Sequence, residues 1–172
     1  MTNRPVEELE AGRRFYEALI PGLDASHFGP LWHLMTLGHL IYADLDRLAA
    51  GQGLSMADVL LLGTLRIDRE RPYRAVDLAR SLFVTPAVLT ARIRKLSDRG
   101  LLTREPNTSD RRTADVRVTG EGSRLVEAAI AKIAQNSNFV RAFRRLKPED
   151  REALARSLGA FHGELDRVLP GA

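Results

Sequence analysis

The sequence predicts a mainly α-helical protein with one small β-hairpin, arranged as a winged helix-turn-helix lobe between two helical regions. Three observations predict this fold class. Two helical segments joined by a short turn stand in the middle of the chain, and two β-type segments follow them directly. The remaining segments have the apolar spacing of amphipathic helices.

Composition bounds the possible classes of protein. The 172 residues are 44% hydrophobic and 28% charged, which suits a packed core with a solvated surface. The absence of cysteine excludes disulfides, cysteine nucleophiles and cysteine-ligated zinc. Residues 1–10 carry no apolar segment typical of a secretory signal, and the longest clear apolar run, Val59–Leu62, is too short to span a membrane. We therefore expect a cytoplasmic protein with no membrane partner.

Charge is unevenly distributed along the chain. Residues 1–50 hold 4 basic and 7 acidic side chains, residues 51–118 hold 13 and 8, and residues 119–172 hold 9 and 7. The positive excess of the middle third is typical of a module that faces a polyanion. Arginine-rich surfaces are common, however, so charge alone leaves DNA binding and an ordinary solvated surface equally open.

The N-terminal third predicts two helices. Val6–Ile20 is helical in pattern and Pro21-Gly22 ends it, and Leu31–Ala50 repeats apolar residues at spacings of three and four. Ser55 is a candidate N-cap for a third helix, Met56–Ile67. That helix is apolar nearly all round, so we expect it at the centre of the fold.

The middle of the chain has the helix-turn-helix pattern. Ala75–Leu82 predicts a short helix, and Phe83-Val84 a turn. Thr85 stands where an N-cap is expected and Pro86 at the first helical position, and Gly100 ends the helix that they open.

This second helix has two different faces. The predicted core face carries Leu89, Ile93 and Leu96, and the opposite face carries Ala87, Thr90, Ala91 and Arg94. Small and polar side chains ending in an arginine suit close approach to the major groove of DNA. A solvated helix face has a similar composition, so this stripe is weak support by itself.

A predicted β-hairpin follows. Leu101–Arg104 and Ala114–Val118 are β-type segments, and a turn-rich loop between them carries Arg111 and Arg112. A hairpin in this position is a wing, whose arginines can reach a phosphate or an A·T-rich minor groove. An ordinary solvated hairpin is the alternative, but helix pair, hairpin and arginines in this order are more specific than any one of them.

The C-terminal third predicts further helices. Thr119 caps Glu121–Asn136, Phe139–Leu146 is a short helical stretch, and Glu149–Leu169 is the last helix. The apolar faces of these helices must be buried against another surface, and we expect a second copy of the chain to provide it. Packing within one chain is the alternative.

A series of short motifs runs from about Leu54 to Leu125. It comprises Val76-Asp77-Leu78-Ala79, Val84-Thr85-Pro86, Thr90, Leu96, Asp98-Arg99-Gly100-Leu101-Leu102-Thr103-Arg104, Asp110-Arg111-Arg112, and Val118-Thr119 with Gly122. Each motif alone is weak, but the ordered series is specific. In this series the sequence resembles the MarR family of winged-helix transcription regulators.

The resemblance implies a homodimer that binds double-stranded DNA at a pseudo-palindromic operator, usually as a repressor, with half-site centres ~10 bp apart. Residues 1–53 and 119–172 would then form dimerisation helices and residues 54–118 the DNA-binding lobe. By position, Arg112 would enter the minor groove, Asp110 would hold that arginine, and Arg111 would touch phosphate. The remaining expected DNA-binding residues are Thr85, Pro86, Ala87, Thr90, Arg94, Lys95 and Arg104. The chain departs from the family at Ala91, where many relatives carry arginine.

Members of the family commonly respond to small aromatic or phenolic ligands. The residues that could line such an effector pocket are Trp32, His33, His39, Tyr42 and Asp58. Ordinary core or interface packing is the alternative interpretation of the aromatic and histidine side chains. His33 and His39 lie six residues apart on different helix faces, so we expect no metal site there.

Two other classes of function compete with a ligand-released regulator. One is a ligand-independent or architectural DNA-binding protein, although scarce lysine and a local positive excess argue against broad coating of DNA. The other is an enzyme, but the sequence has no phosphate-binding glycine loop, no GxSxG and no HExxH. We therefore expect neither enzymatic activity nor a cofactor.

Overall fold

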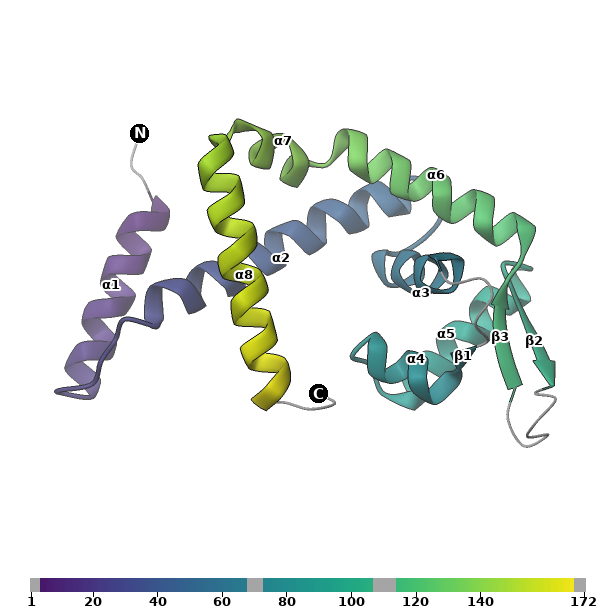
Figure 1. Cartoon of the computed structure of the whole chain (residues 1–172), viewed down its shortest axis with the longest axis horizontal. Helices are drawn as coiled ribbons and strands as arrows, with labels where there is room; N and C mark the ends of the chain where they lie inside the picture. Colours follow the sequence, from purple (N-terminus) through teal and green to yellow (C-terminus); the bar gives the residue numbers. More distant parts are fainter. Residues whose placement is uncertain (1–3, 68–72, 107–113, 169–172) are drawn as a thin grey trace. The chain divides into compact units, whose positions relative to one another are not determined.

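The computed structural model of the chain describes residues 4–67, 73–106 and 114–168 (Figure 1). They divide into two compact units, residues 1–43 and residues 44–172, with the boundary inside one helix. We describe each unit by itself. Within the described residues, no helix is long and apolar enough to cross a membrane.

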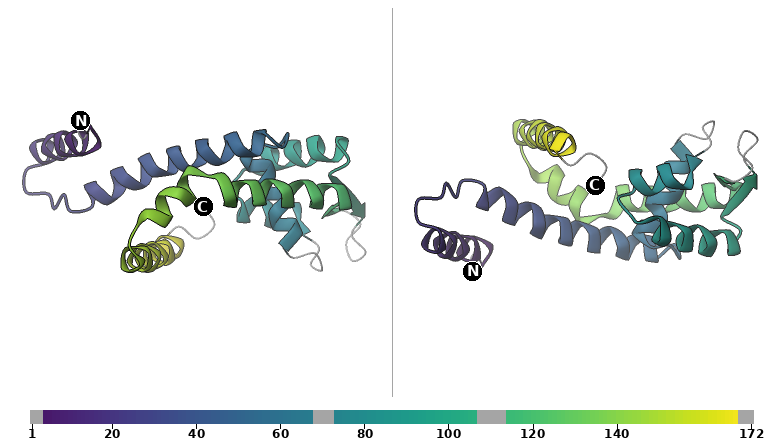
Figure 2. Two further views of the ribbon diagram at one scale, coloured as in Figure 1. Left: turned by 90° about the horizontal axis from the view of Figure 1, so that it is seen from above. Right: turned by 90° about the horizontal axis from the view of Figure 1, so that it is seen from below.

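The first unit is built around a helical hairpin. Helix α1 spans Arg4–Leu19, and helix α2 spans Phe28–Ala50. The two helices approach closely at Gly12, where an added Cβ would lie 2.7 Å from Cζ of Phe28. The ring of Tyr16 lies 5.4 Å from that of Phe28, centroid to centroid, which fixes α1 beside the first turns of α2 (Figure 2).

The second unit begins with the end of α2 and contains the rest of the elements. Its three-stranded antiparallel sheet has the order β1-β3-β2. The helices are α3 (Met56–Ile67), α4 (Ala75–Ser81), α5 (Pro86–Asp98), α6 (Gly120–Asn136), α7 (Asn138–Arg145) and α8 (Pro148–Val168), and the strands are β1 (Tyr73–Arg74), β2 (Leu102–Pro106) and β3 (Ala114–Val118).

The core of this unit lies around α3, as the sequence predicts. Leu61 and Leu62 are fully buried, and α3 packs against α6 and β3. The other buried core residues come from α4, α5, the hairpin and α6: they include Leu78, Leu89, Ile93, Leu96, Leu101, Leu102, Val116, Val126 and Ala129. Burial of large aliphatic side chains from α3, α4, α5, the hairpin and α6 joins these elements in one hydrophobic core, to which α7 and α8 contribute no buried residue.

Helix starts in this unit are fixed by hydroxyl side chains. Thr85 accepts the N–H of Val88 (3.3 Å), and Thr119 accepts the N–H of Gly122 (3.0 Å). Ser137 caps α7 in the same way. Each cap satisfies one of the free N–H groups of a first helical turn, so the predicted starts of α5 and α6 are confirmed within one residue.

Gly122 lets α6 pack directly against the hairpin. A Cβ on this residue would lie 2.2 Å from the carbonyl oxygen of Leu101, far inside contact distance. The same Leu101 carbonyl accepts the N–H of Thr119 at 3.1 Å. The glycine is therefore required by a close approach of two backbones.

A buried carboxylate joins the end of α2 to the start of α7. Asp44 accepts the backbone N–H of Asn138 (2.6 Å) and its side-chain amide (2.8 Å), and it pairs with Arg47 (3.0 Å). Burial acts to raise the pKa of Asp44, but these hydrogen bonds and the Arg47 charge outweigh it, so the pKa lies below its ordinary value.

The structure adds one strand that the sequence reasoning missed. β1 pairs with β3, with Tyr73 opposite Val116 and Arg74 opposite Asp115. Two residues carry no alternation that a sequence pattern can detect, and this strand exists only because β3 is available to pair with it.

Candidate nucleic-acid interface

α4, a tight turn and α5 form the predicted helix-turn-helix. The turn passes through Phe83, which has a positive φ of 52°, and the chain then extends to Thr85 before α5 begins at Pro86. Phe83 is mostly exposed, at 68%. An L-residue other than glycine rarely adopts this left-handed conformation, so the reversal between the helices is a strained point of the backbone.

The two faces of α5 lie in opposite environments, as the sequence predicts. Leu89, Ile93 and Leu96 are buried in the lobe. The opposite face is exposed along the whole helix and forms a shallow groove on the surface of α5 itself. The groove is lined by Pro86, Ala87, Thr90, Ala91, Arg94, Lys95, Asp98 and Arg99.

α5 is held on the lobe by what we call the Asp58 clasp, formed by Asp58, Ser55, Arg92 and Lys95. The side chain of Asp58 is fully buried at the first turn of α3. Its Oδ1 accepts a hydrogen bond from Arg92 (2.9 Å), and its Oδ2 lies 3.6 Å from Nζ of Lys95. Two cations of α5 thus share one carboxylate of α3.

Ser55 completes the clasp. Its backbone N–H donates to Asp58 Oδ2 (3.0 Å), while its hydroxyl oxygen accepts the Asp58 N–H (3.1 Å). This reciprocal pair is a capping box at the start of α3. The Ser55 hydroxyl also accepts a hydrogen bond from Arg92 (3.2 Å).

The clasp favours the ionised form of Asp58. Burial acts to raise the pKa of this carboxyl group, but the hydrogen bonds from Ser55 and the charges of Lys95 and Arg92 outweigh burial. The pKa therefore lies below its ordinary value of 3.8. At neutral pH the clasp is a fully charged contact between α3 and α5.

The hairpin follows α5 as a wing. β2 and β3 pair antiparallel from Leu102 opposite Val118 to Pro106 opposite Ala114. Arg104 is exposed on β2. Asp110, Arg111 and Arg112 lie outside the described residues, so their predicted contacts with DNA remain predictions.

The predicted effector residues fall into two groups. Trp32, His33, His39 and Tyr42 lie on α2 in the first unit, where the rings of Trp32 and His33 are in contact at 5.1 Å between centroids. Asp58 lies in the other unit, and its carboxylate is engaged by the clasp. Within the described residues, no group of side chains could hold a metal ion.

Sequence reasoning missed Arg92, and it assigned Lys95 to DNA without its link to Asp58. The sequence contains part of the pattern that forms the clasp. Ser55 and Asp58 have the spacing of a capping box, and Arg92 and Lys95 are one helical turn apart. Nothing in the sequence says that these two pairs meet, because 34 positions separate Asp58 from Arg92.

A helix-turn-helix followed directly by a hairpin, with the second helix exposing one face, defines a winged-helix DNA-binding protein. The sequence model of the MarR family matches residues 54–114, which covers α3 to the start of β3. The HTH-type transcriptional regulator PecS of Dickeya dadantii (strain 3937) is 29% identical over 122 residues, 70% of this chain and 73% of that protein. Over its winged-helix lobe the chain is therefore similar to the MarR family.

Solved structures share this fold. The transcriptional repressor CouR bound to a 23-mer DNA duplex has a TM-score of 0.69 and 22% identity, over 81% of this chain and 98% of that chain. A DNA complex of MepR from S. aureus has a TM-score of 0.70 and 19% identity, over 77% and 96%. CouR from Rhodococcus jostii RHA1 bound to p-coumaroyl-CoA has a TM-score of 0.64 and 21% identity, over 76% and 89%.

The comparisons agree on the class of protein. Proteins of the MarR family are DNA-binding transcription regulators and not enzymes, and the winged-helix lobe of this chain is similar to theirs.

Proposed function

We propose that the chain is a cytoplasmic repressor that binds a pseudo-palindromic operator as a homodimer and is released by a small aromatic ligand. The observation that carries the DNA-reading part is the exposed face of α5, which the Asp58 clasp orients on the lobe. Thr85, Pro86, Ala87, Thr90 and Arg94 would face the major groove. Lys95, Arg104 and the wing residues Asp110, Arg111 and Arg112 complete the proposed interface.

The proposed dimer uses residues 1–53 and 119–172. Support comes from the large apolar side chains that both regions leave exposed. On α8 these are Leu154, Leu158, Phe161 and Leu165, each between 38% and 49% exposed. Their spacing of three and four residues makes one continuous stripe, which a second copy of the chain would cover.

The proposed ligand is aromatic. Trp32, His33, His39 and Tyr42 combine apolar rings with hydrogen-bonding atoms on one helix. The relative CouR, which has the same fold, binds the aromatic thioester p-coumaroyl-CoA. A ligand would release DNA only by binding more tightly to a DNA-incompetent arrangement of the two lobes.

The first experiment identifies the DNA. Genomic fragments retained by the purified full-length protein are sequenced, and the protein is footprinted on them. A regulator protects one palindrome of two half-sites. Protection that spreads along the duplex without a boundary would contradict the proposal and favour an architectural, ligand-independent binder.

The second experiment tests the ligand. Trp32 is the only tryptophan of the chain, so its fluorescence reports binding near α2 directly. p-Coumaroyl-CoA and simple phenolic acids are titrated into the protein and into its operator complex. We expect a saturable change in Trp32 emission at the same concentrations that release the operator. Release of the operator without a change in Trp32 emission would contradict a ligand pocket at α2.

A further inference from the structure

We propose, on the basis of the proposed function, that α5 reads its half-site through methyl groups and one guanidinium. Thymine methyl groups would pack against Ala87 and Ala91, and a guanine would pair with Arg94. The argument depends on which side chains of the exposed face of α5 are free to contact bases.

Several polar groups at this face are already engaged. The Thr85 hydroxyl oxygen accepts the Val88 N–H as the helix cap. Arg92 and Lys95 are bound to Asp58 in the clasp. A base contact that displaced the Val88 N–H from Thr85, or that drew Arg92 or Lys95 away from Asp58, would compete with a bond within the lobe. These three side chains are better placed to position α5 or to meet a phosphate than to read sequence.

Arg94 is a free cation in the middle of the groove, five residues before Arg99 at its C-terminal end. It is exposed, and it makes no ion pair or hydrogen bond within the part of the chain that the structure describes. A free guanidinium on a recognition helix donates two parallel hydrogen bonds to O6 and N7 of guanine, which is the commonest specific contact of arginine in the major groove.

The N-terminal half of the same face is methyl-rich. Ala87 and Ala91 are one turn apart, both are exposed, and both line the groove with Pro86. These short side chains allow a base pair to approach α5 closely, and the only groups that they present to it are methyl groups. Among the bases, thymine alone presents a methyl group in the major groove. Thr90, between them, can hydrogen-bond with several bases and adds little discrimination.

Helix geometry sets the spacing. Seven residues separate Ala87 from Arg94, which is about 10 Å along α5 at the usual rise per residue. At 3.4 Å per base pair, this distance covers about three steps of the duplex. The half-site should therefore contain one or two thymines and, about three base pairs away, a guanine.

The test uses duplexes selected from a random-sequence library on the full-length protein. Each thymine of the selected half-site is replaced in turn by deoxyuridine, which lacks only the methyl group. We expect one or two positions to lose about fourfold in affinity, the value for one buried methyl group. Replacement of the guanine by 7-deazaguanine, which lacks N7, should cost about tenfold.

A double-mutant cycle ties the guanine to Arg94. In the Arg94→Ala variant, 7-deazaguanine should cost nothing further, while deoxyuridine should keep its effect. Arg144→Ala removes the same charge from α7 and should behave like the wild type. If every deoxyuridine duplex binds within twofold of its parent, or if Arg94→Ala still senses N7, the inference is wrong although the protein remains a DNA-binding regulator. If no sequence is selected at all, the proposed function fails with it.

Discussion

At the scale of single residues, Asp58 is predicted to stabilise the contact between α3 and α5. Its carboxylate is fully buried and joins α3 to two cations of α5. Replacement Asp58→Asn keeps the shape of the side chain but removes the charge that Arg92 and Lys95 face. We expect the free energy of unfolding at pH 7 to fall by about 1–3 kcal/mol, measured by urea denaturation.

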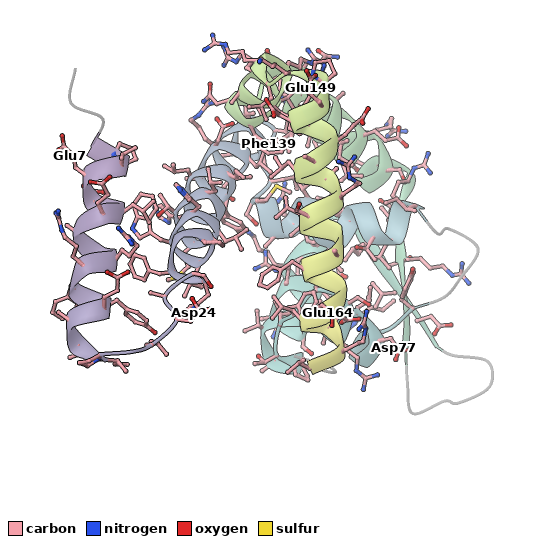
Figure 3. The ribbon with its side chains drawn as sticks, turned by 60° about the vertical axis from the view of Figure 1, so that its left-hand side comes forward. Glu7, Asp24, Asp77, Phe139, Glu149 and Glu164 are labelled. Carbon is pink, nitrogen blue, oxygen red and sulfur yellow. The ribbon has the colours of Figure 1, made fainter. Side chains whose placement is uncertain are left out.

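The stabilisation by Asp58 should depend on pH in a defined direction. The folded-state pKa of Asp58 is lowered, so its stabilisation is present above the unfolded value of about 3.9 and is lost as pH falls through the folded pKa. The difference in the free energy of unfolding between wild type and Asp58→Asn should therefore be largest near neutral pH. It should shrink and disappear as the pH falls below ~4. The control is Asp77→Asn on the exposed surface of α4 (Figure 3), which should show no such gap. A gap that persists at low pH would contradict the role of the charge.

Gly122 supports a second prediction at this scale. Because a Cβ would meet the Leu101 carbonyl oxygen at 2.2 Å, Gly122→Ala must push α6 away from the hairpin. We expect a loss of about 3 kcal/mol in the free energy of unfolding. Gly120→Ala, two residues earlier on the same helix, has nothing within 4 Å of its added Cβ and is the matched control. Equal stability of the two variants would show that this approach is looser than the structure has it.

At the scale of elements, the helices could be predicted because their signals are local. Thr85 and Pro86 mark the start of α5, and Gly100, with φ 71°, follows its end. The alternation of buried and exposed faces on α5 follows from the 3.6-residue period alone. The strand β1 and the Asp58 clasp could not be predicted in this way, since both depend on residues far apart in the chain that meet only in the folded lobe.

The candidate site, too, could be predicted only where its signals are local in the sequence. The exposed face of α5 could be listed from the sequence before its geometry was known, and the structure places those side chains along one groove. Which of its cations are free could not be listed, because Lys95 and Arg94 are adjacent and look equivalent in the sequence. Only the position of Asp58 under α5 distinguishes them.

At the scale of the whole molecule, the apolar stripe of α8 should control assembly. Figure 3 shows α8 from Glu149 near its start to Glu164 near its end, with side chains along its length. Leu158 lies in the middle of the stripe and is 42% exposed in the single chain. In a dimer it would be buried, and Leu158→Asp would bring a charge into that interface.

We expect Leu158→Asp to raise the dimer dissociation constant at least ~100-fold, measured by analytical ultracentrifugation across a concentration series. Helical content should stay unchanged by circular dichroism. Arg156→Ala, on α8 with a 72% exposed side chain, is the control and should assemble like the wild type. A Leu158→Asp protein that remains dimeric at nanomolar concentration would place the interface elsewhere.

The arrangement of two α5 helices on one duplex is tested most directly by the spacing of the half-sites. Five base pairs, about half a helical turn, are inserted between the half-sites of the selected operator, and the same five are inserted outside them as a control. If a rigid pair of subunits presents both helices to successive major grooves, the central insertion should lower affinity at least ~100-fold, and the outer one should leave it unchanged. Equal affinity for both duplexes would contradict the account.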